Sequence, residues 1–160
     1  SNFKKQLCFD VNDDLSGKMI IGEKIGNVPE TNMVSMKELA NKMGIKEESL
    51  PSHYYLSKLL GMNVDSYKIN TPPYIMFDTG STNILVSDSL YKKLEHAKEL
   101  EIYMENDITV KYIIDDNLRS CIEHSVYMNN YPFIIIGNQF MKNMILNFDL
   151  ENKTIGIKQK

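Results

Sequence analysis

The sequence is poor in the residues that mark disulfide-stabilised and nucleic-acid-binding proteins. Its 160 residues include only two cysteines, Cys8 and Cys121, and a single arginine, Arg119. Two cysteines cannot form the disulfide framework of a small secreted domain. The scarcity of arginine removes most candidates for bidentate contacts to phosphate or guanine. These absences favour a reduced compartment and argue against a nucleic-acid partner.

Long hydrophobic runs and a strong net charge are also missing. No stretch approaches the ~18 uninterrupted apolar residues that suggest a membrane-spanning helix, and no signal-peptide pattern is visible. The formal net charge is -3, so a dominant polyanion-binding role is not expected. Apolar residues make up 42% of the chain, which is enough for one ordinary core. We therefore expect a single domain over residues 1–160 that does not contact membranes.

Short apolar segments separated by turn residues predict a mainly β protein. Residues 3–11 and 18–25 are expected to form two strands, joined by a turn that contains Asn, Asp, Ser and Gly. From residue 64 onward, short apolar segments again alternate with turns. Further helices are predicted at 88–99 and near 138–144.

A helical hairpin is predicted as an insertion over residues 33–62. Ser35 and Glu38 have capping-box spacing, apolar residues follow at helical intervals, and Gly44 stands where a helix would end. The buried stripe of the second helix is expected at Tyr55, Leu56, Leu59 and Leu60. The segment also fits a helix-turn-helix module, but its charges nearly balance and it contains no arginine. We therefore expect an accessory element and no binding to nucleic acid.

The strongest chemical signal is the motif Asp-Thr-Gly-Ser at residues 78–81. Four apolar or aromatic residues precede the aspartate, and an apolar segment follows the motif. Downstream, the apolar segment 133–136 ends at Gly137, and residues 145–157 have the pattern of a hairpin. In type and order these features resemble the active-site motif, the second glycine segment and the closing hairpin of the aspartic proteases. The resemblance covers residues 70–160.

The spacing of these motifs resembles one branch of that family. Asp78 and Gly137 lie 59 residues apart, and the chain contains one Asp-Thr-Gly. The spacing is similar to that of the retropepsins, whose small subunits each supply half of the site, whereas a pepsin-like lobe usually has a longer insertion. The resemblance therefore implies a retropepsin-like closed β fold and a symmetric homodimer. It also implies an aspartic endopeptidase that processes a polyprotein, cytoplasmic or virion-associated.

The family chemistry assigns roles to the four motif residues. Two carboxylates share one proton: the ionised group takes a proton from water, and the protonated group donates to the scissile carbonyl oxygen. One Asp78 cannot do both, so dimerisation would complete the site. Thr79 and Ser81 are expected to fix the carboxylates by hydrogen bonds, and Gly80 to permit close backbone approach. No cofactor and no metal are expected, because the three histidines are isolated from one another and from cysteine.

The sequence departs from the family pattern in the flap that covers the site. The family uses a hairpin generally rich in glycine, but no glycine occurs here between residues 99 and 131. The best candidate is the segment 102–114, where Asn106 can adopt a positive φ at the tip. Tyr103 and Tyr112 are candidates to line a substrate cleft, with core packing as the alternative.

Other functions stay open at this point. One is a catalytically silent aspartic-protease-like domain that binds peptides or mediates dimers. Another is one lobe of a pepsin-like enzyme, and a helix-turn-helix module is the weakest alternative. A structure that shows whether two Asp78 carboxylates face each other would separate these hypotheses.

Overall fold

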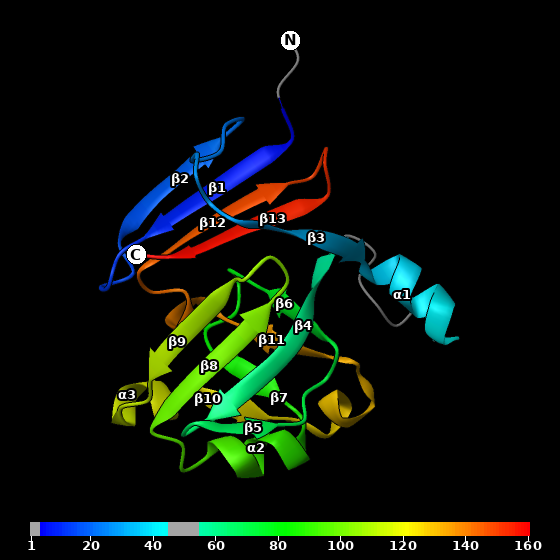
Figure 1. Ribbon diagram of the computed structural model, residues 1–160, viewed down its shortest axis with the longest axis vertical. Coiled ribbons are helices and arrows are strands. Elements are labelled where there is room, and N and C mark those ends of the chain that lie inside the picture. Colours follow the sequence, from blue (N-terminus) through cyan, green and yellow to red (C-terminus); the bar gives the residue numbers. More distant parts are fainter. Residues whose placement is uncertain (1–3, 45–54) are drawn as a thin grey trace.

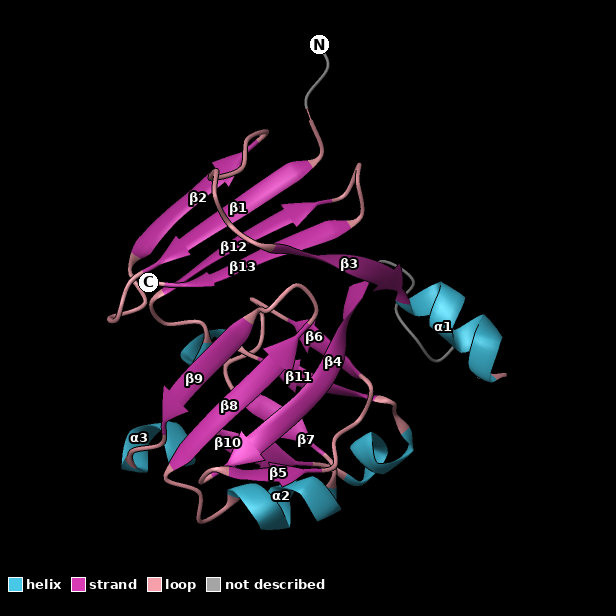
Figure 2. Ribbon diagram, in the orientation of Figure 1, coloured by secondary structure: helices cyan, strands magenta, loops and turns pink. Residues whose placement is uncertain are grey.

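In the described residues, a network of thirteen paired strands forms the framework of the molecule. The structure is a computed structural model that describes residues 4–44 and 55–160 (Figure 1). Strand pairing runs in the order β10-β7-β11-β6-β4-β3-β13-β12-β1-β2, while β5 and β8 pair with β4, and β9 pairs with β8. The strands lie in an upper and a lower layer (Figure 2). The mainly β fold class expected from the sequence is confirmed.

The upper layer is an antiparallel sheet that brings segments from near both ends of the chain together. Its strands are β1 (Gln6–Val11), β2 (Gly17–Ile21), β3 (Glu30–Ser35), β12 (Met144–Asp149) and β13 (Thr154–Gln159). The predicted N-terminal pair of strands is confirmed as the β1–β2 hairpin. Strand β1 also pairs with β12 along its whole length, and the predicted closing hairpin is β12–β13.

The lower layer carries the Asp-Thr-Gly motif. Its strands are β4 (Tyr55–Val64), β5 (Tyr67–Ile69), β6 (Tyr74–Phe77), β7 (Ile84–Val86), β8 (Glu99–Met104), β9 (Thr109–Ile113), β10 (Ile122–His124) and β11 (Phe133–Ile136). Its helices are α2 (Asp88–Leu94), α3 (Asp116–Arg119) and two 3-10 helices, Val126–Asn130 and Asn138–Phe140. The helices predicted at 88–99 and 138–144 are therefore present but shorter. Strand β4 pairs with strands of both layers and joins them.

The predicted helical hairpin is half wrong. Its first helix is α1 (Met36–Met43), capped by the Ser35 side chain and ended by Gly44 at a φ of 68°. The segment predicted as the second helix is instead strand β4, and the predicted start of that helix lies outside the described residues. Leu59 is 4% exposed and Leu60 is 54% exposed, as expected for neighbours on opposite faces of a strand. Pairing with β3, β6 and β8 outweighs the local helical pattern, and the helix-turn-helix interpretation loses its second helix.

Two hydrophobic clusters hold the layers together. The larger one joins Leu146 of the upper sheet to residues of the lower layer such as Met104 and Phe140. The smaller one packs α1, through Met36, against Met76 of β6 and its neighbours. Within the described ranges, no helix is long and apolar enough to cross a membrane.

Asp149 is the most heavily hydrogen-bonded carboxylate in the upper sheet. It is 1% exposed and closes the β12–β13 turn by accepting bonds from the backbone N–H groups of Glu151 and Asn152, at 3.1 and 3.0 Å. It also accepts from the side chains of Asn152, Gln6 and Lys24. Burial alone would raise the pKa of Asp149, but these donors outweigh it and lower that pKa to about 2. This geometry makes Asp149 a structural residue of the β12–β13 turn.

We predict that Asp149→Asn destabilises the fold in a pH-dependent manner. The carboxylate has a lower pKa in the folded chain than its ordinary 3.8, so its stabilisation is full above about pH 4 and is lost as pH falls towards 2. Urea unfolding at pH 6 should show a loss of about 2 kcal/mol. That loss should shrink at pH 3, while Glu123→Gln, an exposed control, should change little. An equal loss at both pH values would contradict the assigned cause.

Candidate active site

The Asp78 carboxylate is fixed by its own loop. Strand β6 ends at Phe77, and the chain turns sharply over the next four residues. One oxygen of Asp78, Oδ1, accepts the backbone N–H of Gly80 at 3.0 Å, and Oδ2 accepts the Ser81 hydroxyl at 2.8 Å. Thr79 and Gly80 are exposed, while Asp78 and Ser81 are half-buried. The loop therefore presents an oriented carboxylate at the surface.

Strand β11 holds this loop from behind. It lies between β6, to which it is parallel, and β7, to which it is antiparallel. The backbone N–H of Asp78 donates to the Ile136 carbonyl at 2.9 Å, and the N–H of Asn138 donates to the Ser81 carbonyl at 2.7 Å. A third bond joins the N–H of Gln139 to the Thr82 carbonyl at 3.1 Å. The two motifs found in the sequence are thus brought together as expected.

Gly137 is required by the close approach of these two segments. A β-carbon at position 137 would lie 2.4 Å from the carbonyl oxygen of Asn83 and 2.6 Å from its nitrogen. Both of these atoms belong to the backbone, so they cannot move away at low cost. The absence of a side chain at Gly137 therefore allows the residue to pack directly against the backbone that follows the Asp78 loop.

The sequence did not reveal how Asn138 and Gln139 take part. They contribute backbone N–H groups rather than side chains, so residue type carries no signal for their role. The only sequence signal for this contact is Gly137, which immediately precedes the two residues. The Oδ1 atom of Asn138 is buried and has no hydrogen-bond partner among the described residues.

The candidate flap hairpin is present but is tied to the upper sheet. Strands β8 and β9 pair as predicted, and Asn106 has a φ of 59° at the tip. Its side chain donates to the Glu30 carbonyl at 2.5 Å, and Glu105 accepts from Thr31. These contacts bind the tip to β3, so they give no support to a mobile cover over Asp78.

The two tyrosines proposed for the cleft have structural partners. Tyr112 is 8% exposed, and its hydroxyl donates to the Phe140 carbonyl at 2.7 Å. The Tyr103 hydroxyl donates to Glu101 and accepts from Asn63. Core packing, the alternative considered for both tyrosines, describes Tyr112 well. Tyr103 stays a candidate with no contact to the Asp78 loop among its hydrogen bonds.

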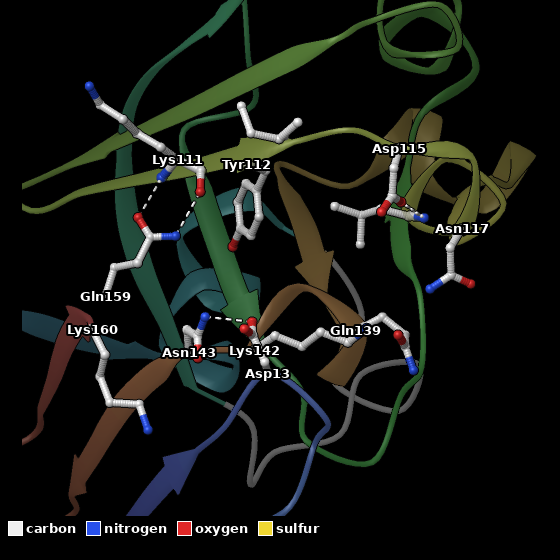
Figure 3. Close-up of a pocket in the computed structure, with 12 residues that line it drawn as sticks. Asp13, Lys111, Tyr112, Asp115, Asn117, Gln139, Lys142, Asn143, Gln159 and Lys160 are labelled. Carbon is white, nitrogen blue, oxygen red and sulfur yellow. Dashed lines mark hydrogen bonds between the residues drawn. The ribbon is translucent and has the colours of Figure 1, made fainter.

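Two other polar regions lie apart from the motif. A pocket of about 540 Å³ lies beside β9 and the start of β12 (Figure 3), and its lining does not include residues 78–81. Several of its polar side chains form hydrogen bonds within the protein, for example Gln159 with both backbone polar groups of Lys111.

The second polar region is on α2, where hydrogen bonds from His124 and Asn129 hold the pKa of Asp88 below its usual value. No cluster of metal-ligating residues is found in the described parts of the chain.

Comparison with known proteins shows the fold. No family model and no curated protein matches the chain. Among solved structures, it is similar to the basic 7S globulin from soybean, with a TM-score of 0.69 and 10% identity. The match covers 99% of this chain and 51% of the globulin chain, so this chain spans about half of that neighbour's length.

The globulin has a pepsin-like fold, so the chain has a β fold of the acid-protease type. At 10% identity the likeness extends to the fold alone.

We predict that Gly137→Ala lowers the stability of the protein by at least about 2 kcal/mol, because a methyl group would overlap the Asn83 backbone. Gly26→Ala is the matched control, since a β-carbon there meets nothing within 4 Å. Urea unfolding followed by circular dichroism provides the measurement. Equal stability of the two variants would show that β11 does not press on the Asp78 loop.

Proposed function

We propose that this chain is one lobe of an aspartic endopeptidase, in which Asp78 provides one of two catalytic carboxylates. The observation that supports the proposal is the exposed Asp78 loop, with one donor to each carboxylate oxygen. A plain turn does not need a second segment to hold it, whereas this loop is bonded to β11 and the residues after it at three backbone positions. The acid-protease fold is consistent with the same role.

In the proposed reaction, Asp78 acts together with a second aspartate. Two neighbouring carboxylates share one proton, because both cannot ionise comfortably at short distance. The ionised group removes a proton from the attacking water, and the protonated group donates to the carbonyl oxygen of the scissile bond. The N–H of Gly80 and the hydroxyl of Ser81 hold the Asp78 carboxylate in orientation throughout.

The second carboxylate is proposed to come from a second lobe of a longer polypeptide. The chain matches nearly all of its own length to about half of a longer pepsin-like chain, which favours this arrangement. The homodimer expected from the motif spacing is the other candidate, supported by the single Asp-Thr-Gly in the chain. The endopeptidase chemistry is the same in both cases.

The proposed substrate is an extended peptide held by main-chain hydrogen bonds as an added strand. Polyprotein processing stays a prediction from the family resemblance. A catalytically silent peptide-binding domain would have the same fold, so activity has to be measured directly.

We predict that Asp78→Asn abolishes peptide hydrolysis by the complete polypeptide that contains these residues, because an amide cannot exchange the proton. Asp116→Asn, on the first turn of α3, is the control and should keep full activity. Circular dichroism should show both variants folded. A peptide with a hydroxyl in place of the scissile carbonyl should inhibit the wild type. Hydrolysis by the Asp78→Asn variant at the wild-type rate would refute the proposal.

Dilution should separate the two sources of the second carboxylate. If both lobes belong to one polypeptide, specific activity should stay constant on dilution. A homodimer should lose activity below its dissociation constant, because separation removes one carboxylate. Activity assays and sedimentation velocity over the same concentration range make this comparison.

A further inference from the structure

The pocket beside β9 is built from five separate segments of the chain. Its lining comes from the β1–β2 turn, from β9, from α3 with the residue before it, from residues 139–143 and from the end of β13 (Figure 3). Its volume of about 540 Å³ is typical of sites that hold small molecules. The pocket is therefore large enough for a ligand of several heavy atoms.

Hydrogen bonds between these segments hold the walls of the pocket in place. The side chain of Gln159 bonds to both backbone polar groups of Lys111, at 3.0 and 2.6 Å, and so joins β13 to β9. The Tyr112 hydroxyl donates to the carbonyl of Phe140 at 2.7 Å and joins β9 to the segment after β11. Because the walls are already ordered, a ligand that enters the pocket loses little free energy in organising them.

Of the three lysines in the lining, two already have acidic partners. The Lys160 ammonium lies 2.7 Å from the Asp10 carboxylate, and the Lys111 ammonium lies 3.7 Å from that of Glu101. Lys142 is half-buried, and it forms no ion pair with any residue that the structure describes. The ammonium of Lys142 is therefore available to an anion from outside the protein.

The two aspartates of the lining bind groups of the protein itself. Asp115 accepts the backbone N–H of Leu118 at 2.7 Å, and Asp13 accepts the side-chain amide of Asn143 at 2.5 Å. Three lysines against two aspartates give the lining a formal charge of +1. This charge suits a monoanion better than a phosphate group, whose usual protein partners are arginine side chains that bond in pairs.

Two amide side chains and an apolar surface complete the lining. The side-chain amides of Asn117 and Gln139 form no hydrogen bond within the described residues, and Figure 3 draws no dashed line to either group. An amide can donate to a carboxylate oxygen and can also accept a peptide N–H. Leu118, which is half-buried, and Ile113, which is 72% exposed, supply apolar surface to the same pocket.

We propose that this pocket binds a small monocarboxylate that carries an aliphatic group. The Lys142 ammonium pairs with the carboxylate, and the amides of Asn117 and Gln139 bond to its oxygens or to a neighbouring peptide group. Ile113 and Leu118 contact the aliphatic group. Such a ligand has two possible sources, the C-terminal residue of a peptide and a free carboxylic acid. The inference does not rest on the proposed function, because the Asp78 carboxylate takes no part in it.

Isothermal titration calorimetry on the complete polypeptide that contains these residues tests the ligand class. The probes are N-acetyl-leucyl-leucine, its C-terminal amide, hexanoate and inorganic phosphate. The peptide acid should bind with a Kd of about 1 mM or lower, and its amide at least about tenfold more weakly, because the amide has no charge to pair with Lys142.

The same titrations separate the two sources and can reject the site. Hexanoate that binds as tightly as the peptide acid would assign the free carboxylic acid, and weaker binding would assign the peptide end. No binding of either acid below about 10 mM, equal binding of the peptide acid and its amide, or tighter binding of phosphate would each overturn the proposal.

Substitutions test the residues that hold the carboxylate. Lys142→Gln should weaken binding of the peptide acid at least about tenfold, while Lys68→Gln, at an exposed lysine of β5 outside the pocket, should leave it unchanged. Gln139→Glu has nearly the same shape as the wild type and should also weaken binding, because it adds a negative charge. Circular dichroism checks that each variant is folded, and either pocket variant alone is decisive. Wild-type affinity in a folded pocket variant would overturn the proposal.

Nuclear magnetic resonance locates the bound ligand independently of activity. In a sample labelled with ¹⁵N at its asparagine and glutamine side chains, the peptide acid should shift the amide signals of Asn117 and Gln139. The signal of Asn63, which bonds to the Tyr103 hydroxyl outside the pocket, should stay in place. Binding that leaves the signals of Asn117 and Gln139 unchanged would place the ligand elsewhere, for example in a substrate cleft, and would overturn the proposal.

Discussion

The placement of β11 between β6 and β7 is the contact on which the rest of the candidate site depends. The two outer strands belong to one continuous segment, and the Asp78 loop joins them. The Asp78 N–H of that loop donates a hydrogen bond to β11, and the carbonyls of Ser81 and Thr82 accept hydrogen bonds from the residues after β11. These bonds form only because β11 lies alongside the loop. The approach is so close that position 137 has no room for a β-carbon. The geometry of the carboxylate is therefore a property of tertiary structure.

The upper sheet shares its hydrophobic core with the lower layer, but part of its apolar face stays exposed. Strands β1 and β12 are far apart in sequence and pair with each other, so this part of the sheet forms only when both segments are present. Its buried carboxylate, Asp149, is fixed by donors from three separate segments. The apolar face is well covered beside the lower layer and open at β2. The sheet is thus wider than the lower layer that covers it.

The sequence predicted the parts of this arrangement that depend on local pattern. An apolar strand leading into Asp-Thr-Gly, and a second apolar strand ending at Gly137, identified both halves of the loop support. Helix α1 was predicted from its cap and its glycine, and both are present. These features need only a few neighbouring residues, so they can be recognised without knowledge of the fold.

The second predicted helix was wrong, because distant contacts decide the structure there. Tyr55 to Leu60 has helical spacing, yet four different strands pair with this segment and its continuation in β4. Strand β4 forms hydrogen bonds with the backbone polar groups of these neighbouring strands. A helix in the same place would leave those groups unpaired. The hairpin tip at Asn106 is likewise fixed by a carbonyl of β3, 76 positions away in sequence. Neither the pairing of β4 nor the hydrogen bond of Asn106 can be recognised from the residue types nearby in the sequence.

Two independent features of the chain bear on the proposed second lobe. The first is chemical: one oriented carboxylate can accept a proton from water but cannot at the same time donate one to the carbonyl oxygen. The second is a matter of packing, because Met19 and Ile21 place apolar surface in water at the edge of a sheet, where unprotected strands associate with other chains. The first feature lies on the loop after β6 and the second on β2, so neither follows from the other. The proposed second lobe would meet the chemical demand by supplying the second carboxylate.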